Sequence, residues 1–253
     1  MTSPIPERQP LIEHITELRR RLIIALCAFG LATAVSYGYA GEIYGFLVRP
    51  LAASVTDPDA RHMIYTGLIE AFFTYLRLAM FAGFILSFPV LAAQIYFFIA
   101  PGLYAREKRM ALPYFFAAPL LFLVGASLCY FIIMPVAFKF FLSFETSGVA
   151  GGLPIRLEAR VSEYLSLVMH LLLAFGICFQ LPVVLALSTQ AGLVRAETLA
   201  KGRRYAIVAI VALAAVVTPP DVFSQVALAG PLIVLYEASV WICRWIEKGK
   251  QHA

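Results

Sequence analysis

Charge is what this sequence has least of. Only 14% of its 253 residues are Asp, Glu, Lys or Arg, whereas soluble globular domains carry roughly a quarter. Hydrophobic residues make up 61% of the chain. One globular core of this length cannot bury that many apolar side chains, so lipid must solvate part of them. The composition therefore predicts an all-α integral membrane protein without a soluble domain.

The motifs of common enzyme classes are also missing. The glycine-rich segment "GVAGG" lacks the lysine and the following helix of a phosphate-binding loop. Neither HExxH nor GxSxG occurs. The few histidines are scattered without the spacing of metal ligands, at His14, His62, His170 and His252. We expect no catalysis, no metal, no cofactor and no nucleic-acid partner.

Cysteine is equally scarce. All four cysteines lie inside or at the end of apolar runs, where pairing is hard to arrange: Cys27, Cys129, Cys178 and Cys243. We interpret them as small packing residues and predict no disulfide framework.

Long apolar segments are what the chain has in abundance. A helix that crosses a bilayer needs about 20 apolar residues. Six segments approach or exceed that length, at about 22–40, 68–100, 111–134, 164–188, 205–218 and 222–243. They predict a single polytopic membrane domain over residues 1–253. The second segment is longer than a span requires, so we expect it to tilt or to kink at Pro89.

The last two segments are predicted to form a tight hairpin. The residues between them include Pro220 and Asp221, and Asp221 is well placed to cap the helix that follows. The segment 205–218 has 14 residues, which is about 21 Å of helix. We therefore expect a short helix that sinks below one membrane surface or thins the bilayer.

Basic residues predict the orientation. Fourteen of the 20 Lys and Arg fall in the two terminal tails and the loops 101–110 and 189–204, namely Arg8, Arg19, Arg20, Arg21, Arg106, Lys108, Arg109, Arg195, Lys201, Arg203, Arg204, Arg244, Lys248 and Lys250. Five flank the other side, at Arg49, Arg61, Lys139, Arg156 and Arg160, and Arg77 lies within a span. Cytoplasmic loops carry the excess of positive charge. We expect both termini in the cytoplasm and 41–67 and 135–163 as long outer loops.

Several polar residues fall inside or at the edge of these spans, namely Glu70, Arg77, Glu163, His170, Gln180 and Glu237. An ionisable group in lipid is costly, so such residues usually face the protein interior or a wet cavity. Glu70 and Arg77 are seven residues apart and share a helix face, and Glu163 and His170 have the same spacing. They are explained either as structural pairs and interfacial charges or as a proton relay.

A relay would make the chain a proton- or ion-coupled small-solute transporter that uses Glu163, His170, Arg77 and Glu237. Such a relay needs a connected series of groups, which spacing alone does not establish. The sequence also lacks the inverted repeats and matched glycine-broken helices of many transporters.

The N-terminal stretch "LIEHITELRRRL", residues 11–22, places apolar residues on one helical stripe, with Glu17 and Arg21 four apart. One interpretation is an interfacial helix that contacts anionic lipids. The other begins from Glu107, which stands among bases in "FIAPGLYAREKR", residues 98–109. Two carboxylates on the cytoplasmic side, Glu17 and Glu107, would bind a cationic peptide through charge-assisted bonds.

Several motifs resemble the TatC family, the multispanning subunit of the twin-arginine protein translocase. They are "HITELRRRL", "RPL" at 49–51, "FIAPGLYAREKR", "EYLSLVMH" at 163–170, "FGICFQLP" at 175–182 and "VTPPDVFSQ" at 217–225. They occur in the family's order over nearly the whole chain. The resemblance implies a cup-shaped, six-helix receptor in the bacterial plasma membrane, with both termini cytoplasmic, that binds twin-arginine signal peptides of folded proteins.

The resemblance also implies roles for individual residues. The signal-binding positions would be Glu17, Arg19, Phe98 and Glu107, and the structural positions of the outer side Pro50, Pro220 and Asp221. Short fifth and sixth helices would contact single-span partners of the TatA and TatB types, in a complex that draws on the proton-motive force and contains more than one copy of this chain. The family often has Glu where this chain has Gln180, an amide that hydrogen-bonds but carries no charge. A passive membrane scaffold remains a third alternative.

Overall fold

The described part of the chain is helical. The computed structural model describes residues 11–55, 62–67, 69–99, 105–146, 157–217 and 222–251. Its helices are α1 (Leu11–Gly38), α2 (Ala40–Ser54), α3 (Glu70–Ile99), α4 (Ala105–Leu128), the π-helical turn η3 (Cys129–Ile133), α5 (Met134–Leu142), α6 (Val161–Cys178), α7 (Leu181–Gln190), α8 (Ala196–Lys201), α9 (Arg203–Val217) and α10 (Val222–Gln251).

Five helical segments of the described residues are long and apolar enough to cross a membrane, namely Ile15–Gly38, Glu70–Phe98, Pro113–Leu142, Val161–Gln190 and Gln225–Gly249. With 15 residues, α9 is shorter than these. The prediction of an all-α membrane protein is confirmed.

The helices differ from the predicted segments at several boundaries. The predicted outer loop 41–67 contains most of α2, and the predicted loop 135–163 begins inside α5. The prediction of a short sixth helix was wrong, because α10 has 30 residues. The predicted helix 164–188 is divided into α6 and α7, since Pro182 cannot donate a backbone hydrogen bond to the preceding turn.

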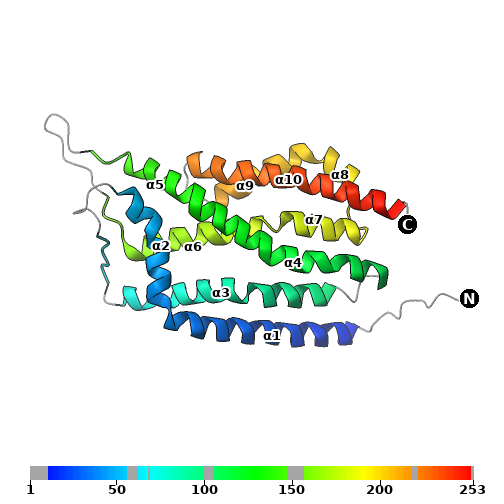
Figure 1. Ribbon diagram of the computed structural model, residues 1–253, viewed down its shortest axis with the longest axis horizontal. Coiled ribbons are helices and arrows are strands. Elements are labelled where there is room, and N and C mark those ends of the chain that lie inside the picture. The colour runs from blue at the N-terminus through cyan, green and yellow to red at the C-terminus, as the bar shows by residue number, and fades with distance from the viewer. Residues whose placement is uncertain are drawn as a thin grey trace, which may run out of the picture.

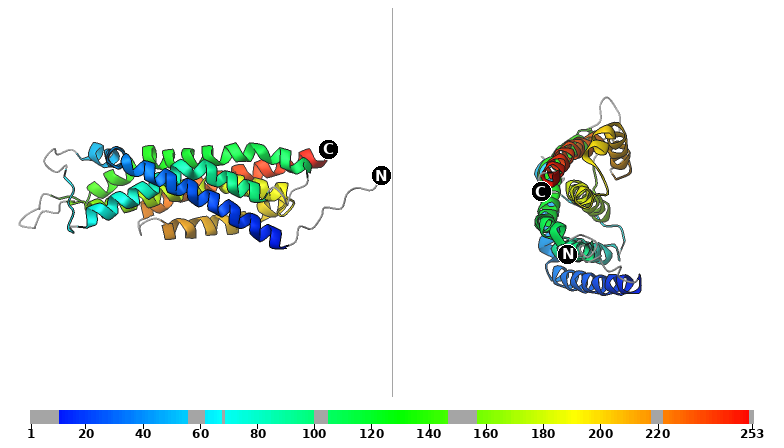
Figure 2. Two further views of the ribbon diagram at one scale, coloured as in Figure 1. Left: turned by 90° about the horizontal axis from the view of Figure 1, so that it is seen from below. Right: turned by 90° about the vertical axis from the view of Figure 1, so that its right-hand side faces the viewer.

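The long helices run side by side and form a curved layer. In the end view of Figure 2 the section is C-shaped, with α1 at one edge, α9 at the other and α7 on the concave side. Figure 1 shows that α1 begins and α10 ends at the same end of the bundle, which we call the termini end. At the opposite end α2 lies across the long helices.

Proline helps to hold α2 in that position. Pro50 is buried inside α2 and has no backbone N–H, so it cannot bond to the carbonyl of Phe46 one turn earlier. The hydroxyl of Tyr130, in η3, donates to that carbonyl at 2.7 Å. The hydroxyl of Tyr164, in α6, donates to the neighbouring carbonyl of Leu47 at 2.9 Å. Two tertiary hydrogen bonds thus fix α2 to the helices beneath it.

Small residues allow α1 and α3 to pack closely. Ala79, Gly83 and Ser87 are buried at four-residue spacing on α3, and Ala32 and Ser36 are buried on α1. Such small-xxx-small patterns let the backbones of membrane helices approach each other. This contact places the first turns of α1 beside the last turns of α3.

Candidate functional site

Residues at the termini end of α1 and α3 form a polar and aromatic cluster. The Nε of Arg21 donates to Oε1 of Glu17 at 3.0 Å, and Nη2 of Arg21 contacts the same oxygen. The guanidinium also lies over the ring of Phe97 in α3, 5.6 Å from its centroid. The ion pair agrees with the four-residue spacing of Glu17 and Arg21, and Arg21 connects α1 to α3.

The pairing of Glu17 with Arg21 uses only one of its two carboxylate oxygens. Both contacts from Arg21 use Oε1, and no described residue donates to Oε2. The two side chains are only about a quarter exposed, 24% for Glu17 and 23% for Arg21. Partial shielding strengthens a charge-assisted bond. A second guanidinium at Oε2 would therefore meet a half-buried, preoriented carboxylate.

The other predicted signal-binding residues lie at the same end. Arg19, also on α1, is exposed and forms no ion pair with a described residue, and Phe98 is half-buried in the last turn of α3. The backbone of Glu107 lies in the first turn of α4, which Figure 1 places at the termini end. The side chain of Glu107 lies outside the described residues. So do the predicted outer-turn residues, Pro220 and Asp221.

The polar residues of the predicted spans are not joined into one chain. Glu237 of α10 accepts from Nη2 of Arg203 in α9 at 2.8 Å. His170 is exposed, with Nδ1 2.7 Å from the carbonyl oxygen of Ser166 one turn earlier. Arg77 is exposed and forms no ion pair with any described residue. The relay that a small-solute transporter would need is therefore not assembled within the described part of the chain.

Glu70 belongs to a network at the opposite end that the sequence did not reveal. Its carboxylate accepts from the backbone N–H groups of Thr66 and Gly67, at 2.9 and 3.1 Å, and from the hydroxyl of Ser162. Nη2 of Arg160 lies 3.5 Å away. Thr66 and Gly67 come just before α3, whereas Arg160 and Ser162 lie at the start of α6. Glu70 therefore joins the starts of these two helices. Among the alternatives that the sequence left open, Glu70 is a charge at the edge of its span that pairs with Arg160, and it forms no ion pair with Arg77.

Backbone pairing reinforces this junction. The N–H of Ile64 donates to the carbonyl of Ala159 at 3.1 Å, and the N–H of Val161 donates to the carbonyl of Ile64 at 3.0 Å. Arg160, between them, also donates to Glu163 at 2.9 Å. The two segments that precede α3 and α6 are thus held together by main-chain and side-chain bonds.

Two carboxylates that share Arg160 allow a matched test of this network. Glu70 is 11% exposed and accepts from several donors, whereas Glu163 is 69% exposed and bonds to Arg160. Exposed ion pairs contribute little to stability. We expect Glu70→Ala to lower the melting temperature of the purified protein by several degrees and Glu163→Ala to leave it nearly unchanged. Equal melting temperatures of the two variants would contradict a stabilising role for the network.

Gln180 joins α7 to α4 inside the bundle. Its Nε2 donates to the carbonyl of Ala118 at 3.0 Å and contacts the carbonyl of Gly176 at 3.4 Å. Gln180 also lines a cavity of about 620 Å³ between α3, α4, α6 and α7, whose walls are mostly apolar. Its amide is therefore both a link between helices and a polar group facing the cavity.

Gln180→Leu should weaken this link. Loss of a neutral hydrogen bond typically costs about 0.5–1.5 kcal/mol. We expect Gln180→Leu and Gln180→Met each to lower the free energy of unfolding of the purified protein by that amount, as measured by thermal unfolding. Because Met keeps the unbranched shape, a Met variant as stable as the wild type would show that the packing of the side chain matters and its hydrogen bond does not.

Comparison with known proteins gives consistent results along the chain. The family described as Sec-independent protein translocase protein (TatC) matches residues 13–231. The Sec-independent protein translocase protein TatC of Rickettsia prowazekii is 46% identical over 93% of this chain and 92% of its own length. The protein of the same name from Magnetococcus marinus is 44% identical over 98% of this chain and 89% of its own.

The solved structures that resemble this chain belong to proteins of the same name. A crystal structure of the twin-arginine translocase receptor TatC superposes with a TM-score of 0.76 at 34% sequence identity, covering 92% of this chain and 99% of that one. A second, of the same receptor in the detergent DDM, has a TM-score of 0.77 at 35% identity, over 90% and 98% of the two chains.

Proposed function

Because the chain belongs to the TatC family of Sec-independent protein translocase proteins, we propose that it is the signal-receptor subunit of a twin-arginine translocase in a bacterial plasma membrane. It binds the twin-arginine signal peptides of folded proteins at its termini end. Binding nucleates an export complex that the proton-motive force drives. The half-buried carboxylate of Glu17, which has one oxygen to which no described residue donates, is the observation that carries this proposal.

In this proposal two carboxylates receive the arginine pair. Guanidinium forms strong, directional bonds with carboxylates. Arg21 holds Glu17 in place from one side, so an incoming arginine approaches from the side of Oε2. Glu107, at the start of α4, receives the other arginine. Arg19 donates to peptide carbonyls, and Phe98 provides apolar surface beside the bound segment.

The orientation that we propose has six spans and both termini in the cytoplasm. Five segments are long enough to cross, and α1 begins at the end where α10 finishes (Figure 1). An even number of crossings is needed for that, so α9 supplies the sixth although it is short. The excess of Lys and Arg on this side supports a cytoplasmic location. A tag inserted in 41–67 or beside Pro220 that reports cytoplasmic exposure would contradict this topology.

The partners are single-span subunits of the TatA and TatB types and further copies of the same chain. The short α9 stands at the edge of the C-shaped layer (Figure 2) and exposes Val208 and Val216, at 67% and 84%. Apolar side chains at such an edge suit contact with other membrane helices. No catalysis by this chain is part of the proposal.

Complementation tests the receptor function directly. The gene is expressed in cells that lack their own copy of this subunit, and export of a folded twin-arginine reporter is measured. We expect the wild-type chain to restore export. Uptake of small solutes by vesicles containing only the purified chain, without restored export, would favour the transporter instead. Restored export by a variant that cannot bind signal peptides would favour the scaffold.

A further inference from the structure

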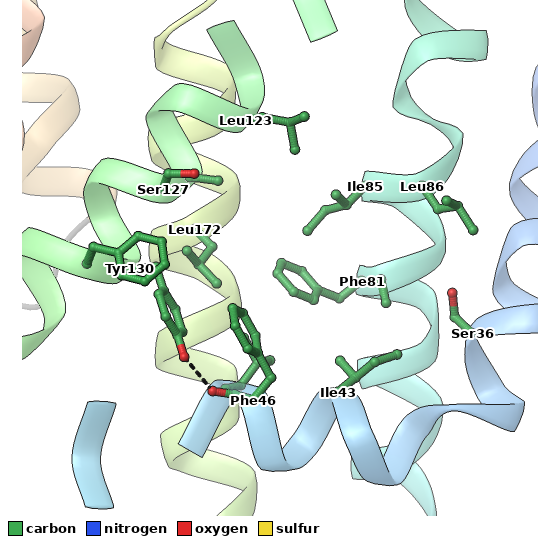
Figure 3. A pocket seen from close by; sticks show the side chains of 14 residues that line it. Ser36, Ile43, Phe46, Phe81, Ile85, Leu86, Leu123, Ser127, Tyr130 and Leu172 are labelled. Atoms are coloured by element: carbon green, nitrogen blue, oxygen red, sulfur yellow. Dashed lines mark hydrogen bonds between the residues drawn. The ribbon is translucent and has the colours of Figure 1, made fainter. Parts of the chain in front are cut away.

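A second hollow of the molecule lies away from the signal-binding residues. It has a volume of about 410 Å³ and is bounded by α3 on one side, by α4 and η3 on the other, and by α2 at one end. Figure 3 shows Leu172 of α6 at its floor and Ile43, Phe81, Ile85 and Leu123 around it. We call it the α2 groove.

The rim of the α2 groove is apolar and open. Leu86, Leu123 and Phe131 line it and are 60%, 51% and 67% exposed. All three lie within helical segments that are long and apolar enough to span the membrane. Their exposed surfaces therefore contact the hydrocarbon of the bilayer, and lipid chains have access to the groove.

A cation stands at the α2 end of the groove. The guanidinium of Arg49 lies 6.0 Å from the ring centroid of Phe46, a lining residue. The ring of Phe46 is stacked on Tyr130, with centroids 4.4 Å apart, and Tyr130 bonds to the Phe46 carbonyl (Figure 3). Arg49 is exposed, and no described carboxylate forms an ion pair with it.

We propose that the α2 groove binds one phospholipid, with an acyl chain between α3 and α4 and the phosphate paired with Arg49. A guanidinium recognises phosphate through charge-assisted bonds that match its planar geometry. Because α2 lies across one end of the long helices (Figure 1), Arg49 is at the depth of the lipid headgroups and the groove at the depth of the acyl chains.

The size of the groove favours a lipid chain over a partner helix. One turn of an α-helix about 10 Å wide and 5.4 Å long already occupies about 420 Å³, which is the whole volume of the groove. A spanning helix has several such turns, so the groove cannot enclose one. A single acyl chain is thin and flexible enough to fill an irregular apolar space, where it would support the packing of α2 on the bundle.

Lipid binding to purified protein tests the proposal. The protein is stripped of lipid in detergent, phosphatidylglycerol is added, and bound lipid is counted by native mass spectrometry while the melting temperature is followed. We expect one tightly held molecule and a raised melting temperature, since a ligand of the folded state stabilises it. Glycerol phosphate, which has the anion but no acyl chain, should neither be retained nor raise the melting temperature.

Three variants locate the site. Arg49→Ala should weaken binding about 10- to 100-fold, as for the loss of a charge-assisted bond. Leu123→Trp should exclude the chain by filling the groove. Lys139→Ala is the control, because Lys139 is an exposed cation in the last turn of α5 and does not line the groove. Binding by Arg49→Ala equal to wild type would overturn the proposal, as would an equal loss in Lys139→Ala.

The same assay addresses a helical occupant. A synthetic single-span peptide of a TatA or TatB type should not displace the bound phospholipid, because the groove is too small for a helix. Displacement of the lipid by that peptide, abolished by Leu123→Trp, would assign the groove to a partner helix and overturn the lipid site.

Discussion

A Glu107→Lys variant should insert and fold like the wild type but lose binding of twin-arginine signal peptides. The backbone of Glu107 lies in the first turn of α4, at the same end of the bundle as Glu17. An arginine pair would engage both carboxylates, and each charge-assisted bond would contribute about 1.5–3 kcal/mol if shielded from water. Lysine replaces one of these attractions by repulsion. Crosslinking of a labelled signal peptide to the purified protein measures the loss.

Conservative variants of Glu107 distinguish the effect of its charge from an effect on the fold. Glu107→Asp keeps the charge and loses only reach, so it should retain more binding than Glu107→Gln. Binding to the wild type should weaken as salt rises, as expected for a partly exposed electrostatic site. Unchanged melting temperatures would exclude loss of fold. If Glu107→Lys crosslinks at the wild-type level, this loop is only a topological anchor and Glu107 is not part of the site.

Substitution of Glu17 is harder to interpret than substitution of Glu107, because Glu17 also pairs with Arg21 within the protein. Its Oε1 holds Arg21, and Arg21 reaches over Phe97 of α3. Glu17→Gln would therefore weaken an intramolecular pair together with any contact to the peptide. Single and double variants of Glu17 and Glu107 would measure how far the two carboxylates act together.

Composition and hydropathy were sufficient for the class of protein, but α2 shows where they fail. Gly41, Gly45 and Pro50 made residues 41–67 look like a loop. The carbonyl of Phe46, freed by Pro50, receives a hydrogen bond from Tyr130, which lies 84 positions further along the chain. A helix that depends on such a distant donor cannot be recognised from its own residues.

Ion pairs between different helices could not be predicted from the sequence either. Helical spacing relates residues of one helix, as it did for Glu17 and Arg21. It could not find the partners of Glu70, which lie before α3 and at the start of α6, or Arg203 as the partner of Glu237. Pairs between helices depend on which helices are neighbours, and hydropathy does not contain that information.

The contact of α1 with α3 was missed for a different reason: small residues add little to hydropathy, so Ala79, Gly83 and Ser87 do not stand out within an apolar run. Their role in close packing becomes visible only when α1 is placed against α3. A Cβ added at Gly83 would lie 2.7 Å from the Cα and backbone nitrogen of Thr33 on α1. Backbone atoms cannot move aside as the end of a flexible side chain can.

Gly83→Ala should therefore be strongly destabilising, although alanine normally favours a helix over glycine. Overpacking of a close contact costs typically about 1–3 kcal/mol, and here the two helices must separate. Gly30→Ala is the matched control, because it lies inside α1 and a Cβ there meets nothing within 4 Å. We expect Gly83→Ala to melt several degrees below the wild type in detergent and Gly30→Ala to melt at or above it.

Signal-peptide binding should also be weaker in Gly83→Ala than in Gly30→Ala, because α1 carries Glu17 and α3 carries Phe97 and Phe98. Separating the helices at Gly83 would shift Arg21 from the ring of Phe97, where it now lies, and with it the orientation of the Glu17 carboxylate. Gly83→Ala should then bind signal peptides more weakly than Gly30→Ala at temperatures where both are folded. Equal melting and equal peptide binding in the two variants would mean that α1 and α3 tolerate a wider separation than this close contact implies.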